Sequence, residues 1–182
     1  MKRIAICLFA LLMVVSLVSC GGNDDAVPQG YQRASNTEVC DYHLYVPDTW
    51  IAKSGTAQNF TSATVAPGDK CNVSVMLLEG EYGQTIPKYW EEQQKKYNAL
   101  YDTFTVVSAQ EVVTVGSGEG SVDGLRYVFV GDLGEGFDEV KQMQIFFIKG
   151  NSFYCFTYTA FADHYDNHLE AVNGILANFA FQ

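Results

Sequence analysis

The sequence has few basic residues, and this shortage limits the partners that the protein can have. It contains 11 Lys and Arg against 21 Asp and Glu, a formal net charge of −10. Removal of residues 1–19, which include Lys2 and Arg3, leaves nine basic residues against the same acids and a charge of −12. An acidic surface repels phosphate groups, so the composition argues against nucleic acid as a partner and against electrostatic binding to anionic lipid.

Residues and motifs typical of catalysis are also scarce. The chain has three histidines, and it contains neither a nucleophile elbow nor a Ser/His/Asp pattern of the hydrolase type. The Gly-rich stretch 116–120 has no lysine and leads into a strand, whereas a phosphate-binding loop opens a helix. We therefore expect a protein that is not an enzyme and that uses no cofactor.

Only one apolar run is long, and it lies at the N-terminus. Ile4 to Val18 follow the basic pair Lys2-Arg3, and the run is shorter than the roughly 20 residues of a membrane-spanning helix. This layout predicts a lipoprotein signal peptide over residues 1–19. The ending Leu17-Val-Ser-Cys20 resembles a bacterial lipobox, so we expect acyl chains such as palmitate on Cys20 and a location at the extracytoplasmic face of the cell membrane. An ordinary signal followed by a chance cysteine is the alternative.

The rest of the chain divides into a linker and one domain. Residues 20–37 contain the lipidated cysteine and a stretch rich in Gly, Asn, Asp, Pro and Gln, a composition typical of flexible spacers. Residues 38–182 are enough for one domain with its own hydrophobic core. Hydrophobic residues make up 48% of the sequence, as in globular proteins.

The domain is predicted to open with a strand that ends at a proline. Alternation places Tyr42, Leu44 and Val46 on one face of this strand, and Pro47 ends its pairing because proline cannot donate to a ladder. Trp50, just after the turn, is predicted to be buried in the core at the end of this strand.

Further along, the pattern predicts mostly strands with two amphipathic helices. A hairpin covers residues 57–65 and 71–79, a helix begins at Thr85, strands occupy much of 106–161, and a last helix begins at Asp163. Each helix carries an apolar stripe that packs on a sheet. The stripes are Ile86, Trp90, Tyr97, Leu100 and Phe104 in the first helix, and Tyr165, Leu169, Val172, Leu176 and Phe179 in the second.

This order of elements resembles the PsbP-like superfamily. The stretches that carry the resemblance are Tyr42-His-Leu-Tyr-Val-Pro-Asp-Thr-Trp50, Ile86-Pro-Lys-Tyr-Trp90, Val122-Asp-Gly-Leu-Arg-Tyr127 and Ile175-Leu-Ala-Asn-Phe-Ala-Phe181. The resemblance implies an α+β fold, an α/β/α sandwich in which helices flank an antiparallel sheet, and a place among bacterial lipoproteins of unassigned role. It implies no activity, because the matching stretches are core signatures rather than reaction motifs.

Two groups of residues are candidates for metal binding. His164 and His168 have the i, i+4 spacing that zinc proteases use on a helix, but the Glu that follows the first histidine in those enzymes is absent. With Asp163 or His43 the pair offers a weak zinc or copper site, and half-exposed residues of a first helical turn are the alternative. The acidic loop 131–139 offers carboxylates for Ca²⁺ without the EF-hand register, so a solvated hairpin loop is the alternative.

The cysteines of the domain are placed to form a disulfide or to remain thiols. Cys40 and Cys71 each open a strand in phase with its apolar face, and an extracytoplasmic location permits a Cys40–Cys71 disulfide. Cys155 lies within an aromatic run, which favours a buried thiol.

We expect the domain to be a monomer that binds a protein or cell-envelope partner. Tyr154, Phe156 and Tyr158 are candidates to line a groove for this partner, and full coverage of the sheet by helices and loops is the alternative. The second predicted function is a receptor for a small ligand or metal cation. Its pocket would lie between sheet and helix, near His43, Asp41 or Gln93.

Overall fold

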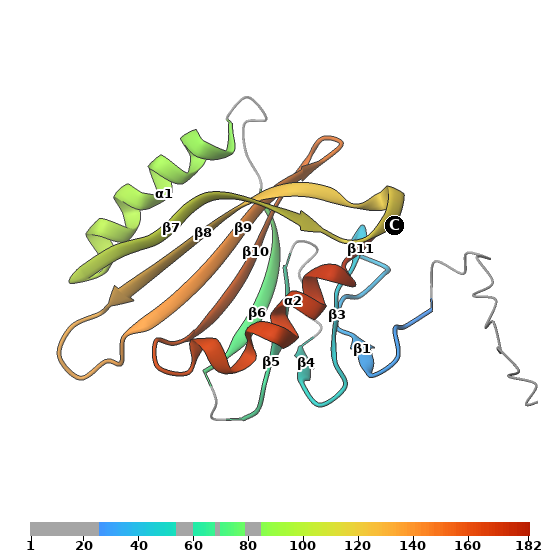
Figure 1. The fold of residues 1–182 in the computed structure, drawn as a ribbon, viewed down its shortest axis with the longest axis horizontal. Helices are drawn as coiled ribbons and strands as arrows, with labels where there is room; N and C mark the ends of the chain where they lie inside the picture. The colour runs from blue at the N-terminus through green and yellow to red at the C-terminus, as the bar shows by residue number, and fades with distance from the viewer. Residues whose placement is uncertain (1–25, 54–59, 68–69, 79–84) are drawn as a thin grey trace, which may run out of the picture.

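The computed structural model describes residues 26–53, 60–67, 70–78 and 85–182. Its largest element is a seven-stranded antiparallel sheet in the order β4-β5-β6-β10-β9-β8-β7 (Figure 1). In that order the strands are β4 (Ile51–Lys53), β5 (Phe60–Thr64), β6 (Asn72–Leu78), β10 (Ser152–Phe161), β9 (Val140–Lys149), β8 (Val122–Asp132) and β7 (Thr103–Val115).

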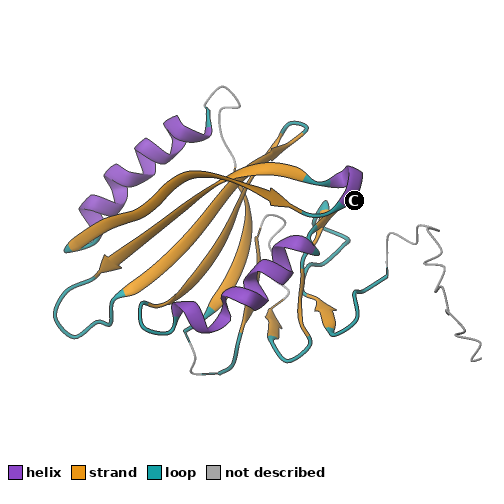
Figure 2. Ribbon diagram, viewed as in Figure 1, coloured by secondary structure: helices purple, strands orange, loops and turns teal. Residues whose placement is uncertain are grey.

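Two helices pack on the sheet, and each contributes to a different core. Along β9 successive side chains point to opposite faces, so Ile145 and Phe147 join the cluster that contains Val172 of α2 (Leu169–Ala177). Phe146 joins the cluster around Trp90 of α1 (Ile86–Leu100). The predicted α+β class is confirmed, but the sheet dominates (Figure 2), and the molecule is not a clear α/β/α sandwich.

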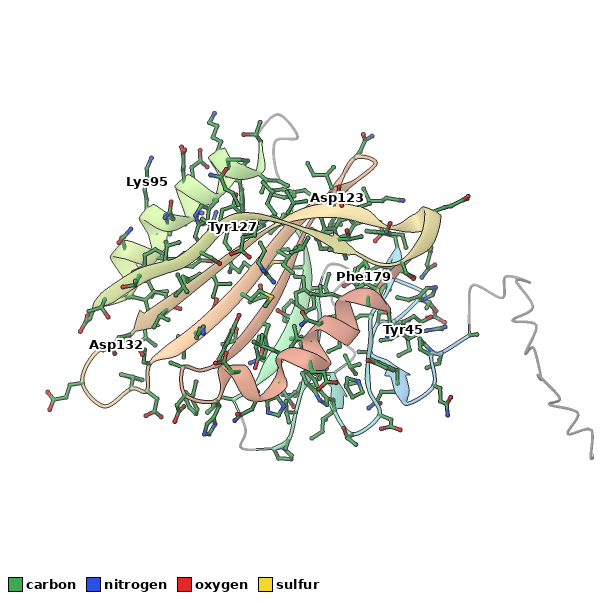
Figure 3. All side chains as sticks on the ribbon, in the orientation of Figure 1. Tyr45, Lys95, Asp123, Tyr127, Asp132 and Phe179 are labelled. Carbon is green, nitrogen blue, oxygen red and sulfur yellow. The ribbon has the colours of Figure 1, made fainter. Side chains whose placement is uncertain are left out.

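Helix α1 begins where the sequence predicts and makes one deep contact. Thr85 precedes it and Pro87 lies in its first turn, where a missing N–H costs no hydrogen bond. Trp90 is its buried residue, while Lys95 projects away from the sheet (Figure 3). The prediction that Leu100 faces the core is wrong, since it is 60% exposed. Tyr97, another member of the predicted stripe, does face the core, and its ring stacks on Phe129 at 4.9 Å.

The strand predicted around residues 41–46 is divided between two small sheets. Its first part, β2 (Tyr42–His43), pairs with β11 (Ala180–Phe181), and its second, β3 (Tyr45–Pro47), pairs with β1 (Tyr31–Arg33). The break occurs because the backbone of Leu44 bonds to Ala34 and to the Ser35 hydroxyl instead of to a neighbouring strand.

Two features of this segment agree with the sequence, and one differs. Pro47 is the last residue of β3, and Trp50 is buried, as predicted. Tyr31–Arg33, which the sequence assigns to the linker, forms β1 within the fold.

The predicted signal peptide and Cys20 lie outside the described residues. Within the described ranges, none of the helices combines the length and the hydropathy of a membrane span.

The C-terminal helix starts later than predicted. A short 3-10 turn, η2 (Tyr165–His168), precedes α2. The residue before this turn is His164 rather than the predicted cap Asp163, and its side chain makes no capping bond. Tyr165, Val172, Leu176 and Phe179 are nevertheless buried, as the apolar stripe predicts. A second 3-10 turn, η1 (Gly118–Gly120), connects β7 to β8.

Candidate functional site

The predicted histidine pair is not arranged as a metal site. Because η2 is a 3-10 turn, the α-helical i, i+4 geometry of His164 and His168 is not formed. His164 Nε2 lies 3.8 Å from Asp163 Oδ2, whereas the His168 ring packs edge-on against Trp50. His43 is buried and stacked on Tyr45. Among the described residues, no group of three metal-ligating side chains is close enough to hold an ion.

The acidic loop lies beside His164, across a hollow of about 480 Å³. Asp138 and Glu139 line the hollow together with Asp163 and His164. At the end of β8, Asp132 (Figure 3) accepts a hydrogen bond from the Gly134 N–H at 2.8 Å, so this carboxylate shapes the turn. Because no three metal-ligating side chains among the described residues are close enough to hold an ion, the hollow gives no further support to Ca²⁺ binding by the loop.

The predicted Cys40–Cys71 disulfide is absent, and this prediction is wrong for the structure. Both residues are buried thiols, and Cys40 Sγ lies 3.5 Å from the Thr61 hydroxyl. Cys40 precedes β2 and Cys71 precedes β6, and these two strands belong to separate sheets. An apolar face on each strand therefore does not make the two strands neighbours. Cys155 is a buried thiol, as predicted. It lies in the core on the α1 side, and burial raises its pKa to about 12.

Peptide mapping under non-reducing conditions should recover Cys40, Cys71 and Cys155 unlinked. Because only an accessible thiolate reacts quickly, we expect iodoacetamide at pH 8 to leave these thiols unmodified in the native protein and to alkylate them in urea. A linked Cys40–Cys71 peptide would contradict the structure.

A pocket of about 350 Å³ between the sheet and the C-terminal segment is the strongest candidate site. We call it the Arg126 pocket. Strands β7, β8 and β9 form one side, and η2 with the first turns of α2 forms the other. The polar and apolar residues on which its chemistry depends are Glu111, Arg126, Lys141, Tyr165, Asp166 and Leu169.

The backbone of β7 is irregular beside the Arg126 pocket. Its pairing with β8 shifts register between Val106 and Ser108 and again between Ser108 and Glu111. Gln110, within the second shift, has φ 57°, which is uncommon for a residue other than glycine. Bulges of this kind bend an edge strand and redirect its side chains, and they are frequent next to binding sites. Here they place Glu111 opposite Arg126.

Two cations in the Arg126 pocket are paired with carboxylates. Arg126 Nε donates to Glu111 Oε2 at 2.8 Å and Nη2 donates to the same oxygen, which lowers the pKa of Glu111. Lys141 Nζ lies 4.2 Å from the centre of the Tyr165 ring and 3.7 Å from Asp166 Oδ1. In each pair the cation is the less exposed side chain, at 33% against 41% for Arg126–Glu111 and 22% against 80% for Lys141–Asp166.

Tyr165 contributes a polar group that the protein does not satisfy. The residue is 3% exposed, and its phenol oxygen is buried without a hydrogen-bond partner among the described residues. Its carbonyl accepts a bond from the Tyr158 hydroxyl at 2.8 Å, so the backbone position is fixed. Burial raises the pKa of Tyr165 to about 12, with Arg126 acting in the opposite direction. The phenol therefore stays protonated at neutral pH as a donor.

Sequence reasoning expects a pocket between sheet and helix but misplaces it. His43, Asp41 and Gln93 are absent from the lining of the Arg126 pocket. Tyr154, Phe156 and Tyr158, the candidates for an aromatic groove, are buried in the core. Arg126 and Lys141 have the alternation of ordinary strand positions, so no local pattern identifies them. The available signal is that Arg126 is a charged residue within the apolar run 125–130.

Comparison with known proteins identifies a fold. No family model and no curated protein matches the sequence. The solution structure of cyanobacterial PsbP from Synechocystis sp. PCC 6803 matches with a TM-score of 0.57 and 15% identity over 91% of this chain and 99% of that one. The Ran-binding protein Mog1p of Saccharomyces cerevisiae matches with a TM-score of 0.52 and 11% identity over 80% and 90%. LpqN of Mycobacterium tuberculosis, described as involved in cell envelope biogenesis, has a TM-score of 0.48 and 13% identity over 84% and 90%.

Proposed function

Because this chain has the PsbP-like fold that its sequence predicts, we propose that it is a lipoprotein with a non-catalytic ligand-binding domain. In this proposal Cys20 carries the lipid anchor at the extracytoplasmic face of the membrane. The domain binds a small ligand in the Arg126 pocket. The observation that carries the proposal is the buried Tyr165 phenol, which lacks a partner among the described residues while it lines this pocket.

A ligand site is a better explanation of these residues than a purely structural role. A buried hydroxyl without a hydrogen bond costs about 1–3 kcal/mol, and a bound ligand removes this cost. The other predicted function, docking of a protein or cell-envelope partner on an aromatic groove, finds less support because Tyr154, Phe156 and Tyr158 are core residues.

Binding in the Arg126 pocket is tested by a fragment screen on isotope-labelled protein. We expect at least one fragment to shift the NMR signals of Tyr165, Lys141 and Leu169 together, because these side chains line the same pocket. The signals of Trp90, on the opposite face, should stay unchanged. If no fragment perturbs the pocket, or if shifts gather elsewhere, the proposed site is wrong.

The anchor is tested by Cys20→Ser. The thiol of Cys20 is the expected lipid acceptor, so this variant should move from the membrane pellet to the soluble fraction in cell fractionation. Stable anchoring needs more than one acyl chain, and the serine variant has none. Cys7→Ser is the matched control, since Cys7 belongs to the predicted signal peptide and its loss should leave the mature protein in the membrane. Membrane retention of Cys20→Ser would contradict the anchor.

A further inference from the structure

We propose that the Arg126 pocket binds a small organic anion, a carboxylate joined to an apolar group. This inference rests on the proposed function and specifies the ligand class of the same site. It follows from three features of the pocket: the excess of hydrogen-bond donors at depth, the position of the two carboxylates, and the apolar floor.

The donors lie deeper than the acceptors. Arg126 and Lys141 are each less exposed than their carboxylate partners, and the phenol of Tyr165 is buried. A guanidinium has five N–H donors, whereas Glu111 engages Nε and Nη2 through one carboxylate oxygen. Arg126 therefore has N–H donors that Glu111 does not use, which suits a ligand rich in acceptors.

The carboxylates of the pocket act as competitors that an anion can displace. Glu111 and Asp166 are 41% and 80% exposed, so each is stabilised by water when it leaves its partner. Charge-assisted bonds to Arg and Lys are stronger in a partly buried site than at the surface. A cationic ligand in the pocket would instead lie beside the positive charges of Arg126 and Lys141, which would repel it.

The apolar side chains that line the pocket favour a ligand whose second part is apolar. Val128 and Met143 are neighbours on β8 and β9, both are buried, and both line the pocket with Leu169. Apolar surface against these side chains contributes affinity in proportion to the area removed from water. A volume of about 350 Å³ is at the small end of ligand sites. Hexanoate and benzoate are therefore suitable probes.

Calorimetry on the chain carrying Cys20→Ser tests the ligand class with matched anionic and neutral probes. We expect hexanoate to bind about tenfold more tightly than hexanamide, and benzoate more tightly than benzamide, because only the acids make charge-assisted bonds to Arg126 and Lys141. Equal affinity for acid and amide would overturn the anion preference while leaving the Arg126 pocket as a binding site. Absence of binding by all four probes would also overturn the inference.

Three substitutions localise the effect. Tyr165→Phe removes the unpartnered hydroxyl, so it should weaken hexanoate about fivefold without lowering Tm. Glu111→Gln removes a competing charge and should tighten hexanoate binding. Tyr127→Phe is the matched control, because this phenol is also buried without a partner among the described residues but belongs to the α1-side core. Unchanged affinity in both Tyr165→Phe and Glu111→Gln would overturn the inference.

Discussion

Replacing Trp90 with alanine should lower the free energy of unfolding by about 3–5 kcal/mol, the cost of removing a large buried aromatic side chain. Trp90 is the buried residue of α1. Its indole stacks on Tyr127 at 4.5 Å and also lies 5.8 Å from the Phe129 ring. Because α1 begins without a side-chain capping bond, its attachment to the sheet depends on this contact more than on the helix itself.

Urea denaturation followed by circular dichroism measures this effect. Leu100→Ala is the control on the same helix, and it should change stability by no more than about 0.5 kcal/mol because Leu100 is 60% exposed. Helix propensities of ordinary residues differ by less than about 0.7 kcal/mol, so a difference of several kcal/mol between the two variants reports burial. A Trp90→Ala variant as stable as Leu100→Ala would show that α1 does not pack on the sheet through its indole.

Gly116→Ala should destabilise the protein by about 3 kcal/mol, because two costs add at this position. Gly116 has φ 84°, a conformation that costs an L-residue about 1–2 kcal/mol. A Cβ at this position would also lie 2.7 Å from the carbonyl oxygen of Phe179. The oxygen is a backbone atom and cannot rotate away. Relief would separate Gly116 N–H from the Leu176 carbonyl, to which it donates at 2.8 Å.

Gly118 provides the control for the second cost. It also has a positive φ, 67°, but a Cβ there meets no atom within 4 Å. Gly118→Ala should therefore lose only the conformational part, about 1–2 kcal/mol. Thermal unfolding of both variants separates the two contributions. Equal losses would mean that the C-terminal segment around Phe179 adjusts freely to the end of β7.

Local pattern predicted most elements of this fold because burial repeats with the period of each element. Alternation identified the strands on both sides of residue 150, and helical spacing identified α1 and the stripe from Tyr165 to Phe179. The resemblance in the stretches around Trp50 and Trp90 predicted a PsbP-like fold, which the structural comparisons confirm.

Features that depend on distant partners were predicted poorly. The strand at residues 42–47 is divided because its two parts pair with segments near opposite ends of the domain. The predicted Cys40–Cys71 disulfide is absent for a similar reason. Each cysteine is in phase with the apolar face of its own strand, but this does not determine which strands are neighbours. The helix expected from Asp163 begins only at Leu169, after Tyr165 has packed on Tyr158.

The amino-acid order by itself determined the acidic charge, the predicted export signal, the mainly β character and the two apolar stripes, because these are properties of composition and of short-range periodicity. Only the tertiary structure decided the Arg126 pocket. Glu111 meets Arg126 through two register shifts in β7, and Tyr165 reaches both from a turn more than 35 residues further along the chain. Side chains so far apart in sequence become neighbours through strand register and packing, and neither can be predicted from local periodicity.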